Sequence, residues 1–103
     1  MLTVVDNIDD SNETGAPVRV LTGPGYQFNN PVAIAADGAL VWVVNERGRS
    51  VTELNAATGA PIRVLTGPRY PFDDPVDIAA DGARVWVVNN FGFWVTEFPA
   101  SSE

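Results

Sequence analysis

Residues 17–59 read PVRVLTGPGYQFNNPVAIAADGALVWVVNERGRSVTELNAATG, and residues 61–103 read PIRVLTGPRYPFDDPVDIAADGARVWVVNNFGFWVTEFPASSE. The second stretch begins 44 residues after the first, aligns with it without a gap and differs from it at 16 of 43 positions. Such a repeat identifies a tandem duplication. The fold is therefore expected to be one in which each unit packs against its own copy.

Strand and turn signals alternate within one unit. The dipeptide Asp37-Gly38 favours a hairpin turn, and the segment after it is rich in β-branched and aromatic residues. No window shows helical spacing of its apolar residues. The sequence therefore predicts an all-β antiparallel meander with strands at 31–36, 39–45, 50–55 and 61–66.

A period of 40 to 50 residues that holds four strands is typical of a β-propeller blade. The segment ALVWVVN at 39–45 is apolar on both faces, as expected for a strand buried between neighbouring blades. The strands that carry Arg19 and Arg63 alternate apolar and polar residues, as an outermost edge strand does. A sandwich of two stacked sheets is the rival interpretation, but its strands would each have one polar face.

The pattern FxxPxxIAxDGxxVWVxNxxGxxVTE resembles bacterial β-propellers of the NHL and YVTN type and, more loosely, streptogramin lyase blades. The resemblance covers the chain from Pro17 onward and implies propeller blades, but these motifs shape a blade whatever its function. The catalytic groups of streptogramin lyases include a histidine, and this chain has none. The pattern stands as Phe28, Pro31, Ile34, Asp37, Gly38, Trp42, Asn45, Gly48 and Val51, and again as Phe72, Pro75, Ile78, Asp81, Gly82, Trp86, Asn89, Gly92 and Val95.

Counting strands gives two blades cut out of frame. The chain is expected to form one module, residues 1–103. In it, residues 1–22 (strands 2–6 and 18–22) complete a neighbouring blade, 23–66 form a first blade, and 67–103 form a second blade without its outer strand. Two blades cannot close a ring, so the chain is either a piece of a longer propeller, natural or designed, or one copy in a ring of copies. The start at Met1, the fading of the repeat and the frame offset favour the ring.

A ring of copies requires that the spare strand at 18–22 pair with VTEF at 95–98 of a neighbouring copy. Such a head-to-tail contact closes only if the rotation between copies divides the circle. Because each chain brings two blades, a homotrimer gives six blades and a homotetramer gives eight. The families that the sequence resembles commonly have six blades, so the homotrimer is favoured.

Composition excludes several classes of function. The chain has no cysteine, histidine or lysine and a net charge of −7, which argues against nucleic acid and against an anionic membrane. No signal peptide is visible at MLTVVDNIDD, so a cytoplasmic location is expected. Without a nucleophile–base pair or a metal cluster, we expect a non-enzymatic protein that uses no cofactor and no metal.

Residues that differ between the two copies are not fixed by the fold, so specific function is expected at these positions. In the turn that reads NERGRS and then NNFGFW, three polar residues become apolar, which indicates a contact surface for another subunit, a protein or a small ligand. In propellers this turn shares one face with the connector before the innermost strand. The candidate binding residues on this loop face are Tyr26, Arg47, Arg49, Tyr70, Asp73, Asp74, Phe91, Phe93 and Trp94.

Asp77 replaces Ala33 in the innermost strand and would line a central channel, facing water or, in a ring of copies, a hard cation. Other repeated residues have structural interpretations. Turn roles are expected for Asp37, Asp81, Asn45 and Asn89, and a role in filling the gap between blades is expected for Tyr26, Phe28, Tyr70 and Phe72.

The sequence thus predicts a non-catalytic propeller scaffold that assembles into a ring by strand exchange and presents its loop face to a partner or ligand. A multivalent carbohydrate-binding propeller is the alternative, because aromatic and acidic residues repeated around a ring suit the capture of glycans.

Overall fold

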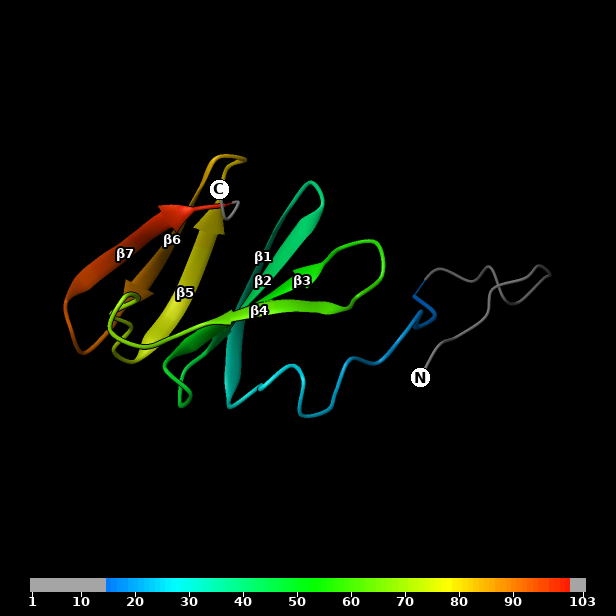
Figure 1. Ribbon diagram of the computed structural model, residues 1–103, viewed down its shortest axis with the longest axis horizontal. Helices are drawn as coiled ribbons and strands as arrows, with labels where there is room; N and C mark the ends of the chain where they lie inside the picture. Colours follow the sequence, from blue (N-terminus) through cyan, green and yellow to red (C-terminus); the bar gives the residue numbers. More distant parts are fainter. Residues whose placement is uncertain (1–14, 101–103) are drawn as a thin grey trace.

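The computed structural model describes residues 15–100, and this part of the chain contains seven strands and no helix. No helix in these residues is therefore available to cross a membrane. The all-β prediction is confirmed. The strands are β1 (Pro31–Asp37), β2 (Leu40–Asn45), β3 (Ser50–Asn55), β4 (Pro61–Leu65), β5 (Pro75–Ala80), β6 (Arg84–Asn89) and β7 (Trp94–Pro99) (Figure 1).

The strands form two antiparallel meanders in chain order. Sheet 1 has the order β1-β2-β3-β4, and sheet 2 has the order β5-β6-β7. Gly38 and Gly82 end the first strand of each sheet with positive φ values of 63° and 93°, a conformation that glycine adopts without strain. The predicted strand at 39–45 begins one residue late because Ala39 belongs to this turn, and the predicted strand at 61–66 ends at Leu65.

Both faces of each sheet carry apolar side chains. The strand register shows which residues share a face, because residues that lie opposite each other point to the same side. In sheet 1, Trp42 lies opposite Ala35 and Glu53, whereas Val43 lies opposite Ile34 and Thr52. We call the first side of each sheet the tryptophan face and the second side the isoleucine face. The tryptophan face carries Trp42, Val44 and Val51 in sheet 1 and Trp86, Val88 and Val95 in sheet 2; the isoleucine face carries Ile34, Val41 and Val43 in sheet 1 and Ile78, Val85 and Val87 in sheet 2.

The core lies between the two sheets, where β5 contacts β1 and β2 (Figure 1). Sheet 1 contributes its tryptophan face and sheet 2 contributes its isoleucine face. The two repeats therefore pack head to tail. The buried members are Trp42, Val44, Val51 and Leu65 from sheet 1 and Phe72, Ile78, Val85, Val87, Phe98 and Ala100 from sheet 2 and its flanking loops.

The opposite faces remain partly in solvent within one chain. Ile34 is 66% exposed although its equivalent Ile78 is 9% exposed, and Val95 is 56% exposed although its equivalent Val51 is fully buried. The prediction of strands that are apolar on both sides is confirmed by β2, in which Trp42, Val43 and Val44 are all buried. Each sheet nevertheless has only one face that the other sheet covers.

The segment before sheet 1 is predicted to pair with a neighbouring copy, and that pairing stays a prediction. Residues 18–22 form no strand within one chain, although a β-bridge occurs at Arg19. The Arg19 guanidinium donates a hydrogen bond of 2.9 Å to the carbonyl oxygen of Ala57 in the β3–β4 turn. The predicted strand at 2–6 lies outside the described residues.

We expect Trp42→Ala to lower the free energy of unfolding by roughly 3–5 kcal/mol, because it empties the centre of the core. Trp42→Phe is the matched control. It keeps an aromatic ring and removes the indole Nε1–H, which is buried and has no hydrogen-bond partner in the part of the chain that the structure describes. Urea denaturation of both variants checks this prediction, and equal losses of stability would contradict it.

Candidate functional site

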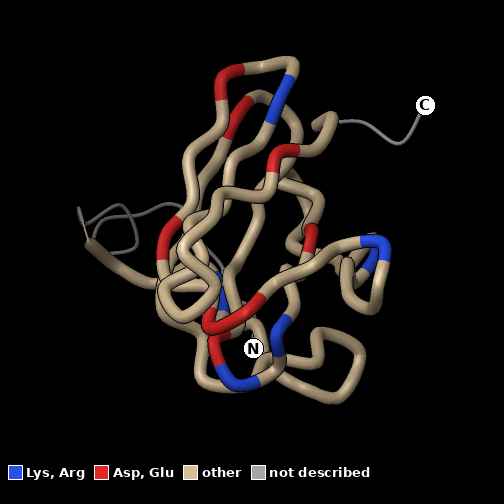
Figure 2. Tube along the Cα trace, turned by 90° about the vertical axis from the view of Figure 1, so that its left-hand side faces the viewer, with Lys and Arg blue, Asp and Glu red and all other residues tan. Residues whose placement is uncertain are grey.

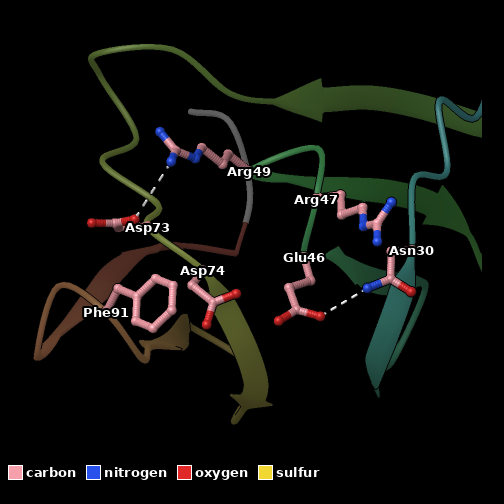
Figure 3. Close-up of a pocket in the computed structure, with 7 residues that line it drawn as sticks. All are labelled: Asn30, Glu46, Arg47, Arg49, Asp73, Asp74 and Phe91. Carbon is pink, nitrogen blue, oxygen red and sulfur yellow. Dashed lines mark hydrogen bonds and ion pairs between the residues drawn. The ribbon is translucent and has the colours of Figure 1, made fainter.

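A pocket of about 390 Å³ opens at one end of the two sheets (Figure 3). Sheet 1 contributes the β2–β3 turn, and sheet 2 contributes the end of the connector before β5 together with the β6–β7 turn. Charged segments of both signs lie close together at this lower end of the molecule (Figure 2). The pocket is lined by Asn30, Glu46, Arg47, Arg49, Asp73, Asp74 and Phe91.

Buried asparagines hold the loops of this site in place. The Asn89 side chain accepts a hydrogen bond of 2.9 Å from the backbone N–H of Asp73, and its amide donates to the Trp94 carbonyl oxygen and to Thr96 Oγ1. In the first repeat, Asn45 likewise accepts from the Asn29 backbone N–H and donates to Thr52 Oγ1, but its other bond goes to Ser50 Oγ and not to a carbonyl oxygen. The predicted role in binding turn backbone is confirmed for Asn89, and both asparagines also bind the connector that precedes their sheet.

The backbone at this end of the sheets is strained. Asn30 and Asp74 have φ values of 57° and 56°, which these residue types tolerate, but Arg49 and Phe93 adopt 51° and 61°, which their longer side chains disfavour. Phe93 is also 91% exposed. A residue that has both an unfavourable backbone conformation and an exposed aromatic ring is not retained for packing within the chain, and such strain is typical of binding sites.

Two carboxyl groups meet in the centre of the pocket. A hydrogen bond with Asp74 raises the pKa of Glu46 above its ordinary value of 4.5, and desolvation and the negative charge of Asp74 act in the same direction. Arg47 opposes the shift, and the side-chain amide of Asn30 donates a hydrogen bond of 2.8 Å to Glu46 (Figure 3). The two carboxyl groups repel each other when both are ionised.

The wall opposite Arg47 is basic and aromatic. The Arg49 guanidinium lies 3.9 Å from the Asp73 carboxylate, an exposed ion pair that contributes little to stability. Phe91 is 69% exposed and lies beside Asp74 (Figure 3). The pocket thus offers hydrogen-bond donors, acceptors and one apolar ring surface. Among residues 15–100, no group of three or more metal-ligating side chains is close enough to hold a metal ion.

The structure brings most of the predicted loop-face residues together. Five of them line the pocket, namely Arg47, Arg49, Asp73, Asp74 and Phe91. The sequence analysis missed Asn30 and Glu46. Both differ between the two repeats, where their equivalents are Asp74 and Asn90, so the rule that singled out the other residues would also have found them.

The predicted tyrosines lie elsewhere. The Tyr26 hydroxyl donates a hydrogen bond of 2.6 Å to the carbonyl oxygen of Gly59, in the β3–β4 turn, and the Tyr26 ring stacks on Phe28. Tyr70 stacks on Phe72 and packs against the core between the sheets. The placement of these side chains beside the acidic residues is therefore corrected, whereas the predicted filling of the gap between the sheets is confirmed for Tyr70.

Phe93 and Trp94 line a separate shallow hollow of about 260 Å³ together with Val88 and Val95 of the tryptophan face of sheet 2. The Trp94 indole donates a hydrogen bond of 2.8 Å to the Pro71 carbonyl oxygen, which holds the ring against its own connector. Asp77 lies opposite Val88 on the tryptophan face of sheet 2 but lines neither hollow. It is exposed and accepts a hydrogen bond from the N–H of Ile78, and its predicted position in a channel stays a prediction.

We expect the carboxyl pair to make folding pH-dependent. Because the pKa of Glu46 is raised in the folded chain, its contribution to stability is present below about pH 4.5 and is lost as the pH rises through the raised pKa. Glu46→Gln is expected to flatten the stability profile in this window, whereas Arg47→Gln, which removes the opposing charge, is expected to steepen it. Urea unfolding midpoints between pH 4 and 7 test this expectation. Identical profiles for wild type and both variants would contradict it.

No family model matches the chain, and no curated protein matches it either. The resemblance to NHL and YVTN propellers thus stands on the repeated residues quoted above, and a functional conclusion must come from the geometry of this chain.

Proposed function

We propose that the protein is a non-catalytic, propeller-type scaffold that assembles from identical copies into a closed ring and presents its loop face, with the polar pocket, to a ligand or partner. One observation carries the proposal: the two faces that the other sheet leaves uncovered are repeat copies of the two faces that pack together in the core.

The geometry of the internal contact supports this assembly. The tryptophan face of sheet 1 covers the isoleucine face of sheet 2, and the free faces are the isoleucine face of sheet 1 and the tryptophan face of sheet 2. The same rotation, applied once more, brings these two free faces together between successive copies. Their apolar side chains match those already packed, because Ile34 repeats Ile78 and Val95 repeats Val51. A second copy is therefore the occupant that fits best.

Such a contact is head-to-tail, so it either closes into a ring or continues without limit. Each chain contributes two sheets, so a closed ring contains an even number of sheets. A homotrimer with six blades agrees with the families that the sequence resembles, and a homotetramer with eight blades is the alternative.

A binding role is favoured over catalysis by the pocket itself. Glycoside hydrolases hold their two carboxyl groups roughly 5 Å or more apart so that the sugar bond fits between them. Glu46 and Asp74 instead lie close enough together for Asp74 to raise the pKa of Glu46. The remaining charged groups of the pocket are Arg47, Arg49 and Asp73, and Arg49 is paired with Asp73.

We expect Ile34→Arg and Val95→Arg each to reduce the assembly to single chains, because a buried guanidinium would replace an apolar contact. Ala39→Arg, in the exposed β1–β2 turn, adds the same charge and is expected to leave the assembly intact. Light scattering after size-exclusion chromatography measures the mass. A wild type that stays at 11.0 kDa at all concentrations would refute the proposal and would point to further repeats of a longer chain as the cover of these faces.

Mixing the two variants tests the direction of the contact. Ile34→Arg leaves the tryptophan face of sheet 2 intact, and Val95→Arg leaves the isoleucine face of sheet 1 intact. One copy of each is therefore expected to form a pair that cannot grow further. A contact between two like faces would instead give no pair in the mixture.

A carbohydrate ligand is the second candidate, favoured by the exposed Phe91 ring beside carboxylate, amide and guanidinium groups. Sugars present a flat apolar face edged by hydroxyl groups, and a ring of such pockets would add multivalency. We expect Phe91→Ala to weaken glycan binding about tenfold or more, equivalent to roughly 1.4 kcal/mol. Phe93→Ala, outside this pocket, serves as the control. A glycan array that shows no binding by the wild type would refute this candidate.

A further inference from the structure

We propose that residues 17–22 of one copy add a fourth strand to sheet 2 of the next copy, along β7, and that an ion pair between Arg19 and Glu97 fixes the register. This inference rests on the proposed self-assembly and specifies the contact that would lock it.

Sheet 1 contains the template for this contact. Its outermost strand β4 pairs with β3, so that Arg63 lies directly opposite Glu53. Arg63 Nε donates a hydrogen bond of 2.7 Å to Glu53 Oε1. The Glu53 side chain is only 5% exposed and the Arg63 side chain 27% exposed. A nearly buried charge needs its partner, so this pair selects one register of β4 over its neighbours.

Sheet 2 has the acceptor half of the template. Glu97 lies opposite Trp86, as Glu53 lies opposite Trp42. Among residues 15–100, no strand pairs with the outer edge of β7. Glu97 instead meets Arg84 at 3.4 Å, in a pair whose side chains are both about half exposed. Sheet 2 therefore resembles sheet 1 without its fourth strand: the outer edge of β7 is open, and the Glu97 carboxylate is half exposed.

Residues 17–22 have the donor half. They read PVRVLT, and β4 with its following residue reads PIRVLT, so Arg19 occupies the place of Arg63 and Leu21 the place of Leu65. Val18 is 53% exposed in its own chain, and the segment has only bridge pairing there. The segment differs from β4 and its following residue at one position, and Val95, Thr96 and Glu97 of β7 repeat the central residues of β3, whereas Trp94, Phe98 and Pro99 replace Ser50, Leu54 and Asn55.

The connector shows that the segment can reach. Between β4 and β5, residues 66–74 carry the chain from the outer edge of one sheet to the inner strand of the next. Residues 22–30 repeat that connector without insertion or deletion and lead into β1. The chain can therefore leave the outer edge of sheet 2 in one copy and enter its own sheet 1 by a path that the structure already contains.

Charge reversal tests the ion pair. We expect R19E and E97R each to raise the protein concentration at half-assembly about tenfold or more, and the double variant R19E/E97R to restore most of the loss, since the reversed pair has the same partners. R84Q is the control, because it removes the partner of Glu97 within its own chain. It is expected to leave assembly unchanged or tighter. Single variants that assemble as the wild type does would overturn the proposal.

A cross-link provides a second measurement that does not depend on the energy of the pair. Because the chain has no cysteine, R19C/E97C is expected to form disulfides only between copies, giving covalent oligomers on oxidation. R19C/T96C, shifted by one residue to the opposite face of β7, is the matched control and should remain uncoupled. If the wild type assembles and Ile34→Arg disrupts it but no cross-link forms, strand donation is wrong while face-to-face assembly stands. A monomeric wild type refutes both.

Discussion

The packing of one repeat on the other through unlike faces is the constraint on which the rest of the structure depends. The tryptophan face of sheet 1 and the isoleucine face of sheet 2 come from the same repeated sequence, yet they form a contact between different surfaces. A contact between unlike surfaces has a direction. It leaves one surface of each kind uncovered by the other sheet. Both surfaces carry apolar side chains, but on the tryptophan face of sheet 2 Asp77 and Arg84 replace Ala33 and Leu40 of sheet 1.

The loop end follows from the same packing. Because β5 lies against β1 and β2, the β2–β3 turn of sheet 1 is brought to the connector that enters sheet 2. The pocket is therefore a property of the junction between repeats. Its composition depends on which residues each repeat contributes, and the equivalents of Glu46 and Arg47 in the second repeat are Asn90 and Phe91. A junction in which the second repeat supplied this turn would therefore have different side chains in its pocket on the same backbone.

The strands of the two sheets and their antiparallel order could be predicted from the sequence, because their signals are local. Alternating apolar residues, Asp-Gly turns and the 44-residue period place every strand of the two sheets to within about one residue. The loop face was predicted well where it depends on topology, as for Asp74 and Phe91. It was predicted poorly where it depends on the direction of one side chain. Tyr26 turns toward Gly59, and Trp94 is held by Pro71, through single hydrogen bonds that no pattern of residue types encodes. The proximity of Glu46 and Asp74 likewise requires two loops from different sheets to meet.

The head-to-tail arrangement has a consequence for the gene. Since each unit carries both surfaces of the junction, a DNA duplication that adds one more unit also supplies the surface against which that unit packs. No compensating substitution is required elsewhere in the protein. The number of units in one polypeptide is thus a variable that recombination can change in single steps, and selection can then act on the loops of each new unit while the β-strands stay as they are.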